Sequence, residues 1–234
     1  MENKPFWKAK TALICYITLF VGIILGSIIV SLLFIATGIS VNDLNFPSAI
    51  IVLPINEGLI IGITLLFAKQ KRITLNQLGL KKPSYKIIVV GFFLAFFLIL
   101  FAGGISVVEE IILGSDPDAE FLVKAILPNN NFQLIIMISI SLLLVGPAEE
   151  LAFRGFIQRG FENSFGKNYG LLIASLLFGL LHGLNSFYSI MPVTVISLFL
   201  GYIWQKTQGN TIATAWIHGL YDALAIAITY FAIT

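Results

Sequence analysis

Two histidines and four charged residues stand out in this chain because their types and spacing could support hydrolysis. They fall in three short motifs, each of which pairs two residues four positions apart. The motifs are Glu149-Glu150-x-x-x-Arg154, Phe178-x-x-x-His182 and His218-x-x-x-Asp222. Carboxylate and imidazole groups placed together can take a proton from water and return it to a leaving group. We therefore predict one catalytic site, formed by Glu149, Glu150, Arg154, His182, His218 and Asp222.

Each motif lies inside an apolar stretch of the sequence. Ionisable side chains are costly in hydrocarbon, so within membrane helices they usually face the bundle interior and mark a functional path. Counted at 1.5 Å per helical residue from the nearest basic turns, the two glutamates, the two histidines and Asp222 lie about 16 to 22 Å deep. Arg154 lies about one helical turn nearer the basic turns. This spacing permits a single site shared by three helices.

Helical spacing also separates the expected roles of the two glutamates. Glu150 and Arg154 are four residues apart on one helix face, which allows a salt bridge. Glu149 points about 100° away around the helix and is free to face water as a general base. His218 and Asp222 are also four apart, so the carboxylate can accept from the ring N–H and select its tautomer. His182 has no partner at helical spacing, and we expect one across helices.

The composition indicates that the bilayer is the main solvent of this protein. Of its 234 residues, 58% are hydrophobic and 11% are charged, and the mean hydropathy is +0.95. The hydrophobic fraction and the mean hydropathy are far above those of water-soluble domains, and the charged fraction is far below. The formal net charge of +2 is too small to suggest a nucleic-acid partner. The single cysteine, Cys15, excludes an intrachain disulfide framework.

Seven apolar stretches are long enough, or nearly so, to cross a bilayer as helices. They span residues 11–37, 47–68, 87–113, 133–162, 168–187, 190–206 and 211–232. We predict an all-α polytopic helical bundle forming a single integral membrane domain over residues 1–234. Within it, residues 1–132 hold the N-terminal spans and a basic connector, and residues 133–232, spans four to seven, form the catalytic core.

Basic residues cluster at alternate ends of the predicted spans. They occur before the first span at Lys4, Lys8 and Lys10, in the 69–86 connector, at 159–167 and at Lys206. The positive-inside rule places these segments in the cytoplasm. We expect a multi-pass protein of the plasma membrane, with its N-terminus and the access to its active site on the cytoplasmic side.

The three motifs in this order resemble the signature of the CPBP family of intramembrane endopeptidases. That family includes CAAX prenyl proteases and bacteriocin-processing or self-immunity proteins, and we expect this chain to fall in its Abi-like bacterial branch. The resemblance is strongest over residues 140–225. It implies that Glu149 and His182 activate a water molecule, while His218 and residue 222 assist the tetrahedral intermediate. A peptide or membrane-associated protein is the implied substrate.

Residue 222 departs from the prenyl protease branch, which has Asn there. An Asn can donate a hydrogen bond to an oxyanion, whereas an ionised Asp repels it. Asp222 must therefore be protonated, orient His218 or help bind a divalent ion. Zinc or another divalent ion would use Glu149, His182, His218 and Asp222, although no His-Glu-x-x-His motif occurs. We favour a site without a metal, and no other cofactor is indicated.

Two other functions use the same residues differently. The fold could serve as a non-catalytic bacteriocin immunity or interaction protein, or the ionisable groups could form the relay of a proton-coupled transporter. Glu57, with Pro54 and Asn56, lies inside the second span. It could line the substrate cavity, but we favour a kink or an interhelical contact. The sequence does not indicate an oligomeric state.

Overall fold

The computed structural model describes residues 7–38 and 46–233, and these residues form helices connected by turns, with no strand among them. The all-α prediction is therefore confirmed. Lys4 and most of the polar loop predicted between the first two spans lie outside the described residues.

Eight separate helical stretches follow one another along the described chain. They are α1 (Ala9–Ala36), α2 (Phe46–Gln70), α3 (Tyr85–Leu113), α4 (Ala119–Ile126), the continuous run from α5 to α7 (131–165), α8 (Lys167–His182), the single turn η4 (Phe187–Ser189) continuing into α9 (Ile190–Lys206), and α10 (Thr211–Ile233). The short helix α4 was not predicted, because its eight residues are too few to cross a bilayer as a span.

Six described helical segments are long and apolar enough to cross a membrane. Their positions correspond to six of the seven predicted spans. The remaining predicted span, residues 168–187, is realised as α8, which has 16 residues and ends at His182. At 1.5 Å per residue it is shorter than the roughly 20-residue length of a full span. The protein is a multi-pass membrane protein that also contains one helix too short for a full span.

The run from residue 131 to 165 contains two π-helical segments, η2 (Ser141–Val145) and η3 (Leu151–Gln158). Between them lies the single turn α6 (Gly146–Glu150), which carries the glutamate pair. The chain stays helical through Gly146 and Pro147. π-turns rotate the following residues relative to an α-helix and are frequent at functional sites.

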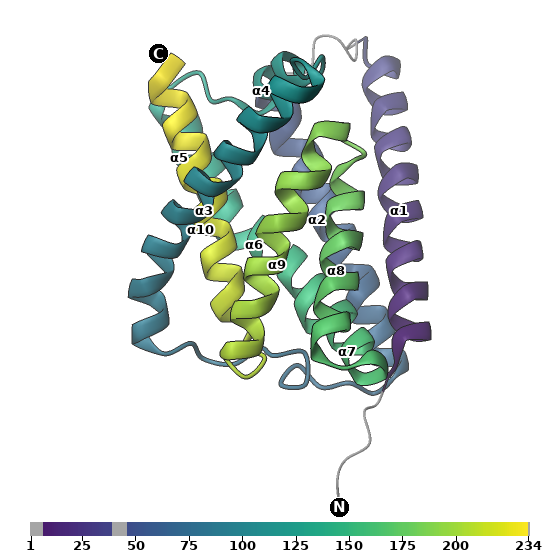
Figure 1. Ribbon diagram of the computed structural model, residues 1–234. Coiled ribbons are helices and arrows are strands. Elements are labelled where there is room, and N and C mark those ends of the chain that lie inside the picture. Colours follow the sequence, from purple (N-terminus) through teal and green to yellow (C-terminus); the bar gives the residue numbers. More distant parts are fainter. Residues whose placement is uncertain (1–6, 39–45, 234) are drawn as a thin grey trace, which may run out of the picture.

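Helix α10 packs against α3, α5, α6 and α9, and Figure 1 shows it beside α3 and α9. Its close approach to the 131–165 run depends on glycines. A Cβ atom on Gly146 would lie 2.7 Å from the carbonyl oxygen of Ala215, and one on Gly219 would lie 2.8 Å from that of Ser141. Because these contacts involve backbone atoms, larger residues would push the two helices apart.

The basic segments gather at one end of the bundle, as the sequence predicts. The Thr211 N–H donates to Gly79 O over 2.8 Å, which joins the 71–84 connector to the start of α10. Lys81 Nζ donates to Gln208 O over 3.2 Å, and Asn163 Nδ2 donates to Trp7 O over 3.1 Å. Helix α4 and the end of α10 lie at the opposite end (Figure 1).

Candidate active site

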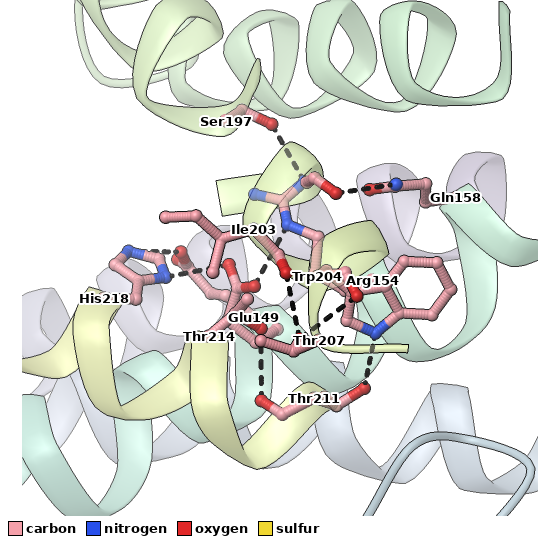
Figure 2. Close-up of polar contacts among 12 residues, drawn as sticks. Glu149, Arg154, Gln158, Ser197, Ile203, Trp204, Thr207, Thr211, Thr214 and His218 are labelled. Carbon is pink, nitrogen blue, oxygen red and sulfur yellow. Dashed lines mark hydrogen bonds and ion pairs between the residues drawn. The ribbon is translucent and has the colours of Figure 1, made fainter. Parts of the chain in front are cut away.

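The six predicted site residues come together from three helices of the bundle. Glu149 and Glu150 lie on α6, Arg154 on η3, His182 at the end of α8, and His218 and Asp222 on α10. Each is within ion-pair distance of at least one of the others. Figure 2 shows Glu149, Arg154 and His218 in this cluster.

Glu150 and Arg154 form the salt bridge that their spacing predicts. Arg154 Nε lies 3.0 Å from Glu150 Oε2, and both side chains are fully buried. Arg154 Nη1 also donates to Ser197 Oγ of α9 over 2.9 Å, and its guanidinium stands 5.3 Å from the ring centre of Phe178. A buried carboxylate and a buried guanidinium stabilise each other only when paired in this way. The pair joins the 131–165 run to α9.

The second oxygen of Glu150 faces His218. Glu150 Oε1 lies 3.2 Å from His218 Nδ1, so the carboxylate can accept from the ring N–H. Asp222 Oδ2 lies 3.6 Å from the other nitrogen, Nε2, and makes no hydrogen bond. We expected Asp222 to select the tautomer of His218. That expectation is wrong, because Glu150 occupies the Nδ1 side at hydrogen-bonding distance.

Glu149 lies between the two histidines. Its Oε1 atom is 3.8 Å from His182 Nε2, and its Oε2 atom is 3.5 Å from His218 Nε2. These distances are longer than hydrogen bonds, so each gap suits a bridging water or a substrate atom. Glu149 is thus the carboxylate of the pair that has no guanidinium partner, as its position around the helix predicts.

His182 takes its hydrogen-bond partner from its own helix. The ring Nδ1 is 3.0 Å from the backbone carbonyl of Phe178. Because a carbonyl oxygen only accepts, Nδ1 carries the proton, and Nε2 faces Glu149 with its lone pair when the ring is neutral. We expected a partner across helices. The four-residue spacing of Phe178 and His182 therefore has a structural reason: it places the Phe178 carbonyl one helical turn before the His182 ring, where Nδ1 can bond to it.

Phe178 also holds both histidines in place through its ring. Its centre lies 4.6 Å from that of His182 and 5.9 Å from that of His218, the second at an angle of 77°. Phe153 packs edge-on against its other side at 4.6 Å. Such packing restricts the rotation of the imidazole rings.

The cluster forms one wall of a cavity of about 430 Å³. Glu149, His182, His218 and Asp222 line it, together with Asn56 and Glu57 of α2. Glu57 is 4% exposed. We favoured a kink or an interhelical contact for this residue, and the structure instead places it at the cavity. The sequence feature that could have identified Glu57 as a cavity residue is its position as an isolated acid within an apolar span.

The cavity extends away from the basic end of the bundle. Beyond the cluster its lining continues to Ile126 of α4, to Leu184 and Asn185 after α8, and to Ile226 of α10. Helix α4 lies at the end of the bundle opposite the connector (Figure 1). We predicted access from the basic end, and this cavity leads in the other direction.

The described residues do not form a metal site. No group of three or more His, Cys, Asp or Glu side chains among residues 7–38 and 46–233 is arranged to hold an ion. The proposed ligand set Glu149, His182, His218 and Asp222 does not fit a metal in this arrangement, and no step below uses one.

Comparison with known protein families matches one family to the part of the chain that contains the cluster. The family model described as type II CAAX prenyl endopeptidase Rce1-like matches residues 131–224. The match covers less than half of the 234-residue chain, and this part of the chain is similar to an Rce1-like domain. This assignment agrees with the CPBP resemblance and supports an intramembrane endopeptidase activity of the CAAX protease type, with a peptide or protein substrate. No curated protein and no solved structure matches the chain.

All six predicted site residues fall inside the Rce1-like domain, whereas Asn56 and Glu57 lie before it. The polar wall on α2 therefore comes from the part of the chain that the family model does not match. Assignment to the Abi-like branch remains a prediction.

We predict that Arg154→Met strongly destabilises the protein. It leaves the fully buried Glu150 carboxylate without a cation, which costs about 3–5 kcal/mol. The double variant Glu150→Gln/Arg154→Met should recover part of this loss, because no unpaired charge remains. Thermal unfolding in detergent measures both. Lys86→Met, at an exposed position of α3, is the control; equal melting temperatures for Arg154→Met and this control would contradict the prediction.

We also predict that the cavity is reached from the α4 end. In a Cys15→Ser background, Ala225→Cys on the cavity wall should react with a membrane-impermeant maleimide from the same side of the membrane as Asp118→Cys. Asn76→Cys in the connector should react only from the opposite side. Labelling of intact cells and inverted vesicles distinguishes the two sides. Labelling of Ala225→Cys together with Asn76→Cys would place the access at the basic end.

Proposed function

We propose that this protein is an intramembrane endopeptidase in which Glu149 activates the attacking water. The observation that carries the proposal is the position of the Glu149 carboxylate on the cavity wall, between His182 and His218 and without a guanidinium partner. A peptide segment in the cavity would present its carbonyl carbon to a water held beside this carboxylate. The cavity volume of about 430 Å³ is within the range of ligand sites in proteins.

Water activation uses Glu149 and His182. The gap of 3.8 Å between Glu149 Oε1 and His182 Nε2 is too long for a direct hydrogen bond and suits a water that donates to both. His182 orients this water through its Nε2 lone pair, because Nδ1–H donates to Phe178 O. Glu149 takes one proton as the water oxygen bonds to the carbonyl carbon.

The tetrahedral intermediate carries a negative charge on the former carbonyl oxygen. We assign the doubly protonated ring to His218, because three carboxylates lie within 3.2 to 3.6 Å of its nitrogens. Its Nδ1–H donates to Glu150, and its Nε2–H faces the cavity and can donate to the oxyanion. Arg154 keeps Glu150 in place for this task.

Collapse of the intermediate breaks the carbon–nitrogen bond. The proton held by Glu149 passes to the departing amine nitrogen, which leaves a new carboxyl group on one product and an amine on the other. Glu149 is then ionised again, and a second water can bind. Each step uses groups of this chain and one water molecule.

Asp222 lies on the Nε2 side of the His218 ring, where the oxyanion would also bind. We propose that it orients the imidazolium before substrate binds, through the 3.6 Å contact between Oδ2 and Nε2. An oxyanion then becomes the stronger acceptor for the same N–H. In this role the carboxylate does not itself contact the reacting atoms.

We predict that Glu149→Gln abolishes peptide cleavage and leaves the fold intact. A carboxamide cannot take a proton from water, and loss of a general base lowers the rate by about 10²–10⁴-fold. Cleavage of a quenched fluorescent peptide library by the protein in lipid nanodiscs measures the effect, with thermal unfolding as a fold check. Glu162→Gln, on α7 and away from the cavity, is the matched control. Full cleavage by Glu149→Gln would refute the proposed role.

A second prediction concerns Asp222. Asp222→Asn should keep cleavage within about tenfold of the unmodified protein, since an amide can hold the ring and donate to the oxyanion. Asp222→Leu should lose substantially more, because it can do neither. The ratio of kcat for the two variants tests this. A loss in Asp222→Asn as large as that in Glu149→Gln would assign the Asp222 carboxylate a direct part in the reaction.

A further inference from the structure

Helix α2 contributes a second polar wall to the cavity. Leu53, Asn56, Glu57 and Ile60 all line it, and their spacing of three, four and seven residues places them on one helix face. The two polar residues lie in the middle of this face, between the two apolar ones. They are therefore held on a rigid element and directed to the same space as the catalytic cluster.

Both polar residues of this wall present acceptor atoms that have no donor. Asn56 Oδ1 and Glu57 Oε2 are buried and make no hydrogen bond within the described part of the chain. An unsatisfied buried acceptor is costly, and more so when it is charged. Two of them on adjacent residues at one cavity indicate a ligand that brings several N–H donors.

The charges around the cavity point to a cationic ligand. Three carboxylates line it, those of Glu57, Glu149 and Asp222, and Glu57 interacts electrostatically with the other two. Arg154 is occupied by Glu150, and no Lys or Arg of the described residues lines the cavity. A positive group of the substrate would stabilise the ionised form of these acidic side chains in a low-dielectric site.

We propose that Asn56 and Glu57 form a subsite for the ammonium or guanidinium group of a Lys or Arg side chain in the peptide substrate. An ammonium has three N–H donors and a guanidinium five, so either can donate to both acceptors. The proposal rests on the proposed endopeptidase function and defines its substrate class. The two residues determine specificity and do not contact the scissile bond.

The test uses the full-length protein in nanodiscs and quenched fluorescent peptides. One position near the centre of the peptide carries Lys, Arg, or their uncharged analogues norleucine and citrulline. The unmodified protein should cleave the charged peptides with a kcat/KM about ten- to a hundredfold higher, as expected for hydrogen bonds to a charged group. Glu57→Gln should remove this preference, and Glu110→Gln, at an exposed position of α3, should keep it.

Asn56→Asp provides a second, independent variant, which decides the question if Glu57→Gln does not fold. It adds a carboxylate beside Glu57 and should strengthen the preference for Lys and Arg. A preference that is absent in the unmodified protein, or retained in Glu57→Gln, would overturn the proposal. So would a preference that Asn56→Asp leaves unchanged.

Binding of the same peptides separates this proposal from the proposed function. If the unmodified protein cleaves none of them, the endopeptidase function fails, and fluorescence anisotropy then tests the subsite alone. Tighter binding of the Lys and Arg peptides that is lost in Glu57→Gln would support the subsite. Equal binding of charged and uncharged peptides would overturn it.

Discussion

The fully buried ion pair between Glu150 and Arg154 is the interaction on which the arrangement of this site depends. Neither charge is tolerable in this environment without the other, and both side chains have 0% exposure. Each also has a second task. Arg154 reaches Ser197 of α9, and Glu150 reaches His218 of α10. One pair therefore sets the positions of three helices and the orientation of an imidazole ring.

This pair explains why two adjacent glutamates have different chemistry. Glu150 is neutralised by a guanidinium and is fully enclosed, so it acts through the residues that it holds. Glu149 lies between the two histidines, has no guanidinium partner and lines the cavity. A carboxylate without a fixed cation is the one able to exchange a proton. The division follows from the rotation between neighbouring helical residues and from the placement of one arginine.

The backbone allows this cluster to form by bringing helices unusually close. Gly146 and Gly219 permit backbone-to-backbone contact between the 131–165 run and α10. The π-turns on both sides of α6 adjust which residues of that run face inward. Helix α8 is short enough for His182 to lie at its end, one turn after the carbonyl that fixes its ring.

The sequence by itself determined the helical class, the three motifs whose charged residues and histidines lie together, and the salt bridge between Glu150 and Arg154. These follow from apolar length, from the cost of charge in lipid and from contacts within one helical turn, all of which are local. Only the tertiary structure decided that Glu150, not Asp222, is the partner of His218 Nδ1, and that the cavity extends toward α4. It also placed Glu57 of α2 at that cavity, almost a hundred residues before the glutamate pair. Such contacts depend on how the helices rotate and cross. Packing between distant segments sets this geometry, so no local periodicity in the sequence predicts it.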